Sequence, residues 1–388
     1  MPENQFMRID LVITELETGG AEKCCAELAI FLSKRGHRVR VFALGPRPVE
    51  SNDSLVRLLE TNNIELHFLG GKAWWTLPRV VAKLRRLLKL DRPDVVQSFL
   101  WHANVVSAWV VPSLGIPFFS GIRITERRRA RHALDRWSTS RSKKTVCVSQ
   151  GVADWCVQTE RVDASKLLVI PNGIAILAEN HSIPSDPQSV PANARILLFV
   201  GRLEPQKGID VLAQHAEKLL SQLPDHHLVL IGDGSLRQPL ETVAQQQSLT
   251  GRIHCLGKRN DVRAWMARSE LLLLPSRFEG MPNVILEAMA EGLPVVTTRV
   301  EGVAELLGDQ LERQSVARDA WNDFFELAIS LANSPERRRT LGTENRNRAK
   351  SEFALDEQLK QYEALYCDSS RMGQLPGGFA SLTTGYCL

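Results

Sequence analysis

Residues 276–292 read Ser-Arg-Phe-Glu-Gly-Met-Pro-Asn-Val-Ile-Leu-Glu-Ala-Met-Ala-Glu-Gly. Glu279 stands in a loop broken by glycine and proline, and Glu287 follows eight positions later on a segment with helical apolar spacing. Pro282 suits the first turn of that helix, because its missing N–H is not needed there. The stretch predicts a carboxylate, free backbone N–H groups at a helix start, and a second carboxylate within the helix. Such a set fits a ligand with hydroxyl groups and phosphate, although an ordinary strand–loop–helix unit with solvated acids is the alternative.

The remainder of the chain alternates strands with helices, the order expected of a parallel sheet with helices on both faces. Apolar runs in the first half predict strands at residues 8–14, 38–44, 95–98, 118–122, 145–149 and 167–170. Similar runs in the second half predict strands at residues 196–200, 227–231, 253–256, 271–274 and 295–298. The predicted fold class is therefore α/β, with two doubly wound Rossmann-like domains facing a cleft. Ligands of such sheets bind at the carboxyl ends of the strands.

The segment between the two halves is rich in Pro, Ser and Asn, which predicts a linker. A Gly/Ser/Thr-rich end without periodicity predicts a disordered tail. The expected parts are an amino-terminal Rossmann-like domain over residues 1–177, a linker over 178–193, a second Rossmann-like domain over 194–352, a closing helix over 353–367 that returns to the first domain, and the tail over 368–388.

Composition narrows the class of protein. At 388 residues the chain can form two domains, and its net charge of +4 is too small to indicate a nucleic-acid partner. The seven cysteines form no Cys-x-x-Cys pair and no secretory signal is recognisable, so we expect reduced thiols in a cytoplasmic protein. Residues 105–122 contain no charged side chain, but two prolines and two glycines interrupt them. This favours a helix followed by a buried strand over a membrane span.

A second motif, residues 201–208, follows a predicted strand and reads Gly-Arg-Leu-Glu-Pro-Gln-Lys-Gly. Arg202 can bind two oxygens at once and Lys207 supplies a point charge, so the pair beside a helix start fits a diphosphate. A solvated loop is the alternative. Residues 232–235, Gly-Asp-Gly-Ser, form another tight turn after the next strand. The sequence has no Walker loop and no Gly-x-Gly-x-x-Gly, which leaves ATP and nicotinamide cofactors without support.

These motifs resemble those of the retaining glycosyltransferases of family four, which have the two-domain GT-B fold. The resemblance extends over nearly the whole chain, to residue 368. It rests on the Glu279/Glu287 pair and on residues 19–22 (Gly-Gly-Ala-Glu), 148–149 (Val-Ser), 171–174 (Pro-Asn-Gly-Ile), 201–208 and 232–234. Each motif is modest alone, but their order and spacing are highly specific.

The resemblance implies a role for each charged residue on the donor side. Glu287 matches the residue that binds the ribose hydroxyls of the nucleotide, and Glu279 matches the acid beside the anomeric carbon of the transferred sugar. Arg202 and Lys207 match the pair that holds the donor diphosphate. The implied donor is a nucleotide-diphospho-sugar, for which we expect a UDP-sugar. No metal is expected, and the absence of an Asp-x-Asp motif agrees.

Main-chain contacts with the donor are implied at further positions. Gly19 and Gly20 lie in the glycine loop that approaches the diphosphate from the opposite domain. Arg259 and Val262 lie where the base is gripped by main-chain atoms. The remaining positions of this kind are Gly232, Gly280, Met281, Pro282 and Asn283.

The acceptor side departs from the family pattern. Many relatives carry His-x-His near the end of the strand at residues 95–98, whereas residues 97–104 here read Gln-Ser-Phe-Leu-Trp-His-Ala-Asn. Phe99 occupies the usual histidine position. We therefore consider His102, or Asn104, for the polar role toward sugar or acceptor, with a purely structural histidine as the alternative.

Residues 123–144 carry nine basic residues and two acids, and Trp137 lies among them. This composition predicts a surface for anionic lipid headgroups or a diphosphate-linked lipid acceptor, with attachment at the inner face of the cytoplasmic membrane. A solvated loop and helix face is the alternative.

The sequence thus predicts a retaining glycosyltransferase of hexosyltransferase type. The expected acceptor is a glycan or a polyprenyl-diphosphate-linked molecule in cell-surface polysaccharide or glycoconjugate synthesis. Two other functions stay open: a sugar-nucleotide epimerase of GT-B fold, and a sugar-nucleotide-binding protein without turnover. The second is an alternative because Phe99 replaces the usual histidine. The spacing of Glu279 and Glu287 favours transfer.

Overall fold

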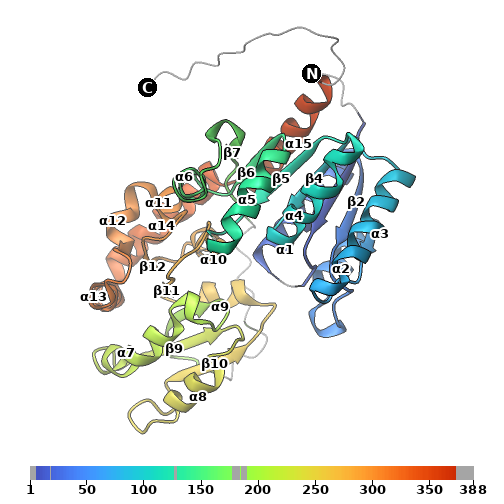
Figure 1. Ribbon diagram of the computed structural model, residues 1–388. Coiled ribbons are helices and arrows are strands. Elements are labelled where there is room, and N and C mark those ends of the chain that lie inside the picture. The colour runs from blue at the N-terminus through green and yellow to red at the C-terminus, as the bar shows by residue number, and fades with distance from the viewer. Residues whose placement is uncertain (1–5, 18, 126–128, 177–183, 185–189, 373–388) are drawn as a thin grey trace. The chain divides into compact units, whose positions relative to one another are not determined.

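The computed structural model describes residues 6–17, 19–125, 129–176, 184 and 190–372 (Figure 1). Contacts between Cα atoms divide the chain into two compact units. The first unit consists of Met1–Phe119, Arg141–Lys143 and Leu359–Leu388, and the second of Ser120–Ser140 and Lys144–Gln358. The boundary passes through a strand near residue 119, while the domain limits expected from the sequence stay a prediction. Most of the expected linker, and the tail from residue 373, lie outside the described residues.

A seven-stranded parallel sheet has the order β3-β2-β1-β4-β5-β6-β7. Its strands are β1 (Arg8–Ile13), β2 (Arg38–Ala43), β3 (Glu65–Phe68), β4 (Val95–Phe99), β5 (Phe118–Ile122), β6 (Lys144–Cys147) and β7 (Leu167–Val169). All six strands expected from the sequence are present. The additional strand β3 is a short edge strand, and only its second and fourth residues are apolar, so it lacks the buried run that marks the others.

The second sheet is six-stranded and parallel, with the order β10-β9-β8-β11-β12-β13. Its strands are β8 (Arg195–Val200), β9 (His226–Ile231), β10 (Ile253–Gly257), β11 (Leu271–Leu274), β12 (Val295–Thr298) and β13 (Ser315–Val316). Both sheets start in the middle, extend to one edge, and then return to fill the other side. This is the doubly wound arrangement predicted from the sequence.

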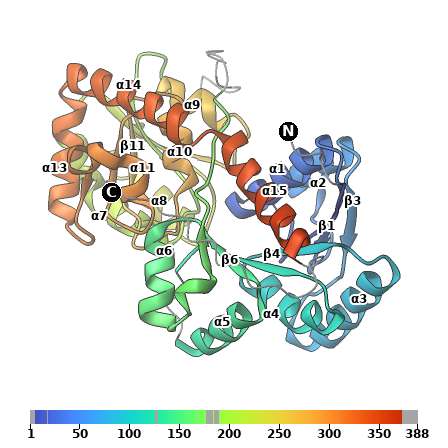
Figure 2. The ribbon, with the colours of Figure 1, turned by 90° about the horizontal axis from the view of Figure 1, so that it is seen from above.

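Helices connect the strands (Figure 2). Those of the first half are α1 (Gly20–Lys34), α2 (Ser54–Thr61), α3 (Leu77–Leu90), α4 (Trp101–Val110), α5 (Arg129–Arg141) and α6 (Gln150–Trp155). Those of the second half are α7 (Ile209–Ser221), α8 (Arg237–Ala244), α9 (Val262–Arg268), α10 (Asn283–Ala290), α11 (Val303–Leu307), α12 (Leu311–Gln314), α13 (Trp321–Ala332), α14 (Pro335–Glu352) and α15 (Leu355–Met372). The uncharged stretch 105–122 forms most of α4 and then the buried strand β5, as expected. Among the described residues, no helix is both long and apolar enough to cross a membrane.

Helix α15 returns to the first unit, as the sequence predicts. Tyr366 is fully buried, and its hydroxyl donates to Gln97 Oε1 on β4 at 3.3 Å. Glu363 accepts from Arg35 Nε at 2.7 Å and lies 2.9 Å from the imidazole of His37. Arg35 and His37 lower the pKa of Glu363 against the opposing effect of burial. The helix continues to Met372, five residues beyond its expected end.

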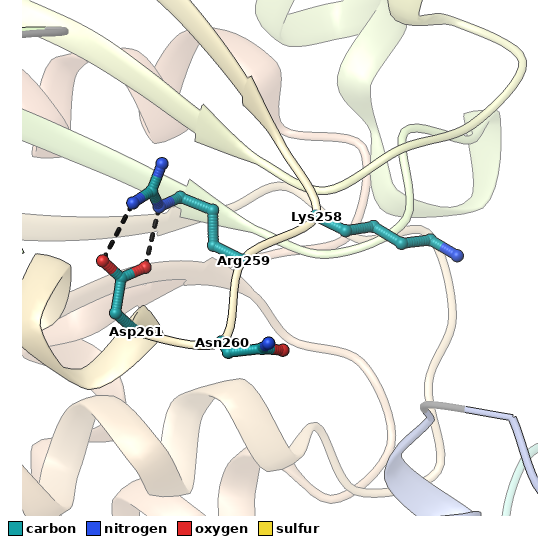
Figure 3. Close-up of a pocket in the computed structure, with 4 residues that line it drawn as sticks. All are labelled: Lys258, Arg259, Asn260 and Asp261. Atoms are coloured by element: carbon teal, nitrogen blue, oxygen red, sulfur yellow. Dashed lines mark hydrogen bonds and ion pairs between the residues drawn. The ribbon is translucent and has the colours of Figure 1, made fainter. Parts of the chain in front are cut away.

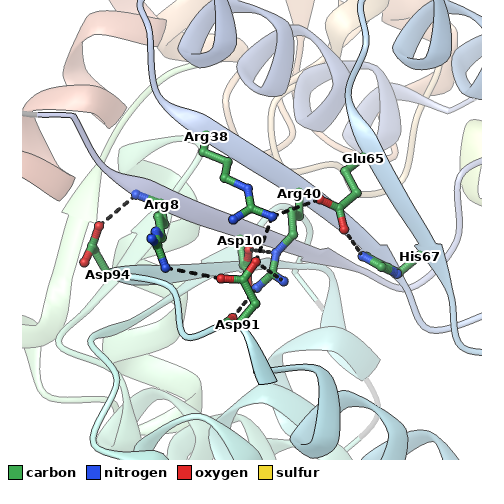
Figure 4. Close-up of polar contacts among 8 residues, drawn as sticks. All are labelled: Arg8, Asp10, Arg38, Arg40, Glu65, His67, Asp91 and Asp94. Atoms are coloured by element: carbon green, nitrogen blue, oxygen red, sulfur yellow. Dashed lines mark hydrogen bonds and ion pairs between the residues drawn. The ribbon is translucent and has the colours of Figure 1, made fainter. Parts of the chain in front are cut away.

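A network of charged side chains crosses the first sheet (Figure 4). At its centre Asp10 and Arg40 pair in register on β1 and β2, and the guanidinium donates to both carboxylate oxygens at 2.8 and 2.6 Å. Burial raises the pKa of Asp10 to about 6, although Arg40 opposes the rise. Asp10 and Arg40 lie in the first halves of their strands, away from the carboxyl ends where such sheets bind ligands. The network therefore serves the stability of the sheet.

Candidate functional site at the carboxyl edge of the second sheet

The point where the strand order of the second sheet reverses lies between β8 and β11. These two strands pair directly, although two strands, three α-helices and one 3₁₀ helix separate them in sequence. The loop after β8 is residues 201–208, and the loop after β11 is residues 275–282. Parallel strands end at the same edge, so the two motifs singled out in the sequence become neighbours. Such switch points are where doubly wound sheets bind ligands.

Lys207 and Glu279 join these two loops. Lys207 Nζ lies 2.5 Å from Glu279 Oε1, and Ser276 Oγ donates to the same oxygen at 2.7 Å. Both charged side chains are largely buried, with 15% and 9% of their surfaces exposed. A buried carboxylate needs such partners, because burial without them is costly. Both are site residues predicted from the sequence, and the structure brings them into direct contact. Their roles toward a ligand stay predictions.

Two glycines permit this close approach. Gly208 has φ of +70°, and a Cβ there would overlap the carbonyl oxygen of Pro275. Gly280 has the same constraint, because a Cβ would overlap the carbonyl oxygen of Arg123. Any side chain at either position would force the loops apart. These glycines therefore fix the position of the Glu279 loop against both neighbouring segments.

Arg202 lies in the same loop as Lys207, and Gln206 bridges it to the Glu279 loop. Arg202 Nη2 donates to Gln206 Oε1 at 3.0 Å, while Gln206 Nε2 donates to the carbonyl oxygen of Phe278 at 3.0 Å. The carbonyl oxygen of Gln206 in turn accepts from the N–H of Arg277 at 2.8 Å. Sequence reasoning assigned Gln206 no role, since a glutamine in a loop carries no signal of its own.

Residues that follow β6 and β7 hold the other side of the Glu279 loop. Ser149 Oγ donates to the carbonyl oxygen of Gly280 at 2.8 Å. Asn172 Nδ2 donates to Asn283 Oδ1 at 2.6 Å, and Arg123 donates to Asn172 Oδ1. Ser149 and Asn172 belong to motifs that carried the family resemblance without an assigned role. Their role here is to position the loop.

Glu301, which follows β12, is another residue that the sequence did not single out. Its Oε2 accepts from the main-chain N–H of Glu279 at a long 3.4 Å, and its Oε1 pairs with Arg318 at 3.0 Å. Only 14% of the Glu301 side chain is exposed. A third carboxylate thus lies beside the Glu279 loop, with its charge compensated by Arg318.

Glu287 occupies the second turn of α10, as its spacing predicted, and is half-buried. The helix begins at Asn283 after Pro282, one residue later than a proline in the first turn would give. No side chain caps the start of α10. The positive end of the helix dipole lies at this start, where anions are stabilised.

Three successive loops of the sheet edge are linked by main-chain hydrogen bonds. Gly201 N donates to the carbonyl oxygen of Ile231 at 3.0 Å, and Gly232 N donates to that of Gly257 at 2.9 Å. Glu204 accepts from both the N–H and the hydroxyl of Ser235, which lowers the pKa of this glutamate. Gly232 therefore lies beside the Arg202 loop, and its contact with a donor stays a prediction.

Next to Gly257, a pocket is lined by Lys258, Arg259, Asn260 and Asp261 (Figure 3). The Arg259 side chain turns back to Asp261, with contacts of 2.7 and 2.9 Å to the two carboxylate oxygens. It also lies over the ring of Trp265, 5.7 Å from the centroid. The Arg259 guanidinium is therefore already paired with Asp261. A ligand in this pocket would meet main-chain atoms instead of a free guanidinium. Val262 begins α9 directly after this turn.

The other expected site residues belong to the first unit. Gly19 and Gly20 form the start of α1 after β1, and His102 lies exposed in the first turn of α4 after β4. Strands β1 and β4 pair at the switch point of the first sheet. His102 contacts Trp101, edge to face, with ring centroids 4.9 Å apart. The roles of these three residues toward a ligand stay predictions.

Asn104, considered from the sequence for a polar role toward sugar or acceptor, has a structural role in the first unit. Asn104 is buried, and its Oδ1 accepts from Ser98 Oγ at 2.7 Å. Phe99 is also buried and contacts Tyr362 of α15, with ring centroids 6.4 Å apart. The strand end therefore belongs to the core around α15. Leu100, between Phe99 and α4, has φ of +71°, which a leucine adopts only under strain.

Residues 123–144 are only partly available as a basic surface. Arg123 is bound to Asn172, and residues 126–128 lie outside the described part of the chain. Of the side chains that the structure describes in this segment, the exposed cations are Arg136, Arg141, Lys143 and Lys144. Across the described residues, no group of three or more His, Cys, Asp or Glu is arranged to hold a metal.

Family models and known proteins match both halves of this chain. The family model Glycosyltransferase Family 4 matches residues 18–176, and the model Glycosyl transferases group 1 matches residues 194–334. An uncharacterized glycosyltransferase of Methanocaldococcus jannaschii is 30% identical over 266 residues, which cover 66% of this chain and 71% of that protein. The UDP-Gal:alpha-D-GlcNAc-diphosphoundecaprenol alpha-1,3-galactosyltransferase of Escherichia coli is 24% identical over 303 residues, 74% of this chain and 80% of that protein.

Among solved structures, Anabaena HepE in complex with UDP and glucose is similar in fold. Its TM-score is 0.80 at 19% identity, and the match covers 93% of this chain and all of that one. This confirms the fold expected from the order of strands and motifs. The chain belongs to the group 1, family 4 glycosyltransferases and has their GT-B fold.

Proposed function

We propose that this protein transfers a hexose from a UDP-sugar, with retention of anomeric configuration, to a glycan or lipid-linked acceptor in cell-surface polysaccharide or glycoconjugate synthesis. The observation that carries the proposal is the buried Lys207–Glu279 pair at the switch point of the second sheet. It combines a cation for phosphate with a carboxylate for hydroxyl groups. The similar HepE is described in complexes with UDP and UDP-glucose, and the similar E. coli enzyme uses UDP-Gal.

On the donor side, the diphosphate would lie between Arg202, Lys207 and the start of α10. Arg202 can bind two phosphate oxygens, and the positive end of the α10 dipole lies at a helix start that the N-cap residue Pro282 does not cap with its side chain. The Glu287 carboxylate, one turn further along, would accept hydrogen bonds from the ribose hydroxyls. Main-chain atoms around Arg259 would hold the base, because the guanidinium is already paired with Asp261.

Departure of the nucleoside diphosphate would leave an oxocarbenium-like sugar and place negative charge on the leaving oxygen. Arg202 and Lys207 would stabilise that charge, and one such donor typically contributes about 2.7–4 kcal/mol to lowering the barrier. Glu279 would contact the sugar hydroxyls beside the anomeric carbon. For retention, the acceptor hydroxyl attacks from the face that the leaving group departs, while its proton passes to the diphosphate.

On the acceptor side, the exposed His102 would contact the sugar or the acceptor from the end of β4. The similar E. coli enzyme acts on a diphosphoundecaprenol-linked sugar, which supports a lipid-linked acceptor here. Exposed cations of α5 and β6, such as Arg136 and Lys144, would contact the acceptor diphosphate or anionic headgroups. This would place the protein at the inner face of the cytoplasmic membrane.

The test is incubation of the full-length protein with UDP-glucose, UDP-galactose, UDP-N-acetylglucosamine and GDP-mannose, with and without polyprenyl-diphosphate-linked sugar acceptors. Release of UDP together with a product whose new bond keeps the donor's anomeric configuration supports the proposal. Inversion at C2 of the donor sugar would assign an epimerase instead. Tight donor binding without either reaction would assign a binding protein.

A further inference from the structure

A surface in the first unit, distant in sequence from residues 123–144, combines unusual exposure of tryptophan with unusual positive charge. Trp74 and Trp75 are 82% and 67% exposed, the highest fractions of any tryptophan in the described chain. Helix α3, which follows them, carries Arg79, Lys83, Arg85, Arg86 and Lys89 and no acidic residue. This helix alone therefore has a charge of +5, while the whole chain has a net charge of +4.

The two tryptophans are held outward by ordered structure. They form a short 3₁₀ turn, Trp74–Thr76, and their rings meet edge to face with centroids 5.9 Å apart. The Thr76 hydroxyl donates to the carbonyl oxygen of Ala73 at 2.6 Å and accepts from the N–H groups of Lys72 and Ala73. The turn is thus fixed independently of the indole rings. Exposure of large apolar rings on a fixed turn marks a contact surface.

The orientation of α3 separates its apolar and basic sides. Val80, Leu84 and Leu88 are buried in a core that also includes Val106 and Val110 of α4. The opposite stripe carries Arg79, Arg86 and Lys89, all exposed. In the described part of the chain these three cations have no acidic or hydrogen-bonding partner. Lys83 and Arg85, in contrast, donate to Phe68 O and Ser113 Oγ at the flanks of the helix.

Helix α4 extends the same surface, because α3 and α4 share one core and cover the same face of the sheet. Trp109 of α4 is 59% exposed. Leu77 and Leu90, at the two ends of α3, are also exposed, at 39% and 72%. We name this surface, made of Trp74, Trp75, Leu77, Arg79, Arg86, Lys89, Leu90 and Trp109, the α3 surface.

We propose that the α3 surface binds an anionic lipid bilayer, with the cations on phosphate headgroups and the tryptophans at the boundary with the acyl chains. Tryptophan favours this boundary because its ring is apolar and its N–H is polar. Unpaired Lys and Arg near the surface are attracted by acidic headgroups. An acidic protein would use the cations but would not require a fixed pair of exposed indoles. A nucleic acid would need a charge track that the modest charge of the whole chain does not supply.

The inference does not depend on the proposed transfer reaction, and it assigns a different surface from residues 123–144. The test is co-sedimentation of the full-length protein with phosphatidylcholine vesicles, with and without phosphatidylglycerol. Wild type should bind only the anionic vesicles, and its tryptophan emission should shift to the blue. Arg79→Glu/Arg86→Glu should weaken binding by more than about tenfold, since roughly fivefold is typical for each cation lost.

Trp74→Ser/Trp75→Ser should also weaken binding and should remove most of the blue shift. The comparison variant Arg337→Glu/Arg339→Glu, on the exposed side of α14, carries a matched charge change. It should retain most of the binding. Circular dichroism and UDP-sugar turnover with a soluble acceptor verify that each variant is folded.

Three outcomes would overturn the proposal. One is wild-type protein that does not bind anionic vesicles. Another is binding by Arg79→Glu/Arg86→Glu and by Trp74→Ser/Trp75→Ser that equals the binding by wild type. The third is binding to heparin as strong as binding to anionic vesicles, weakened by Arg79→Glu/Arg86→Glu but not by Trp74→Ser/Trp75→Ser. That result would assign the α3 surface to soluble polyanions. None of these outcomes affects the transfer assay, so failure here is distinguishable from failure of the proposed reaction.

Discussion

Lys207 Nζ lies 2.5 Å from the carboxylate of Glu279, across the point where the second sheet reverses its strand order. The cation follows β8 and the carboxylate follows β11. In the proposed reaction the cation would bind the diphosphate and the carboxylate would bind the sugar. The two groups that would hold opposite ends of the scissile bond therefore neutralise each other in the free protein. Both are poised without leaving a buried charge uncompensated.

This pairing predicts a specific double-mutant result. Lys207→Met should lower the free energy of unfolding by about 2–3 kcal/mol, because it leaves the Glu279 carboxylate buried without its cation. Lys207→Met/Glu279→Gln should recover much of this loss but none of the activity. Lys218→Met, at an exposed site on α7, is the control and should change neither the free energy of unfolding nor the activity. Urea unfolding and UDP release measure the two properties. Additive losses of stability in the double variant would disprove the coupling.

Gly280→Ala should damage both the fold of the loop and turnover. The added methyl group would overlap the carbonyl oxygen of Arg123, so the loop must move, at a cost of about 1–3 kcal/mol. Gly151→Ala is the matched control, since its methyl group would meet its nearest neighbours at 3.5 Å, an ordinary contact. Thermal unfolding compares the two variants. A Gly280→Ala protein as stable and active as Gly151→Ala would contradict the described packing.

Glu270 should stabilise the second unit in a pH-dependent way. Hydrogen bonds from His226 and Arg195, with the charge of Arg338, outweigh burial and lower the pKa of Glu270 from 4.5 to about 2. A carboxyl group with a lowered folded-state pKa stabilises the protein above pH 4.5 and loses this effect as the pH falls toward 2. Glu270→Gln should therefore reduce stability by roughly 1–2 kcal/mol at pH 7, after allowance for partial exposure.

The difference between wild type and Glu270→Gln should shrink when unfolding is measured at successively lower pH below 4.5. Glu336→Gln, at an exposed position on α14, is the control and should show no such trend. A constant difference across this range would mean that Glu270 is not held ionised by its partners.

Glu160 should show the opposite dependence. Burial raises its pKa above 4.5, and the nearby Cys156 and Asp135 add to the rise. A carboxyl group that stays protonated in the folded state destabilises the protein progressively as the pH rises above the unfolded-state value. Glu160→Gln mimics the protonated form, so its stability relative to wild type should increase from pH 4.5 to pH 8. A variant that loses stability relative to wild type over this range would show that the carboxylate is ionised.

The sequence predicted the parts of the fold that depend on apolar periodicity. Each apolar run predicted as a strand is a strand in the structure. The alternation of strands and helices was enough to predict two doubly wound domains. β3 and β13 were missed, because an edge strand of four residues and a strand of two contain too few apolar positions to form a pattern. The end of α15 was placed five residues early, since polar residues after Tyr366 continue the helix without an apolar signal.

The proximity of Arg202, Lys207 and Glu279 was predictable because motif spacing fixes them relative to strand ends, while their roles toward a donor stay predictions. Arg202, Lys207 and Glu279 each follow a strand directly, so a parallel sheet brings them together. Gln206 and Glu301 were not predictable, because their contacts depend on how two loops distant in sequence approach each other. The acceptor side was the least predictable part. The sequence suggested Asn104 for a polar role toward sugar or acceptor, whereas the structure shows a buried amide that accepts from Ser98.

The most direct test of the account is the rate of sugar transfer from the preferred UDP-sugar by Glu279→Gln, measured together with its affinity for UDP. The carboxylate is proposed to contact the sugar and not the nucleotide. Turnover should therefore fall by about 10²–10³-fold while UDP affinity stays within a few-fold of wild type. Glu287→Gln should show the complementary pattern, with weaker UDP binding. Full turnover by Glu279→Gln would contradict the claim that the Lys207–Glu279 pair is the centre of the active site.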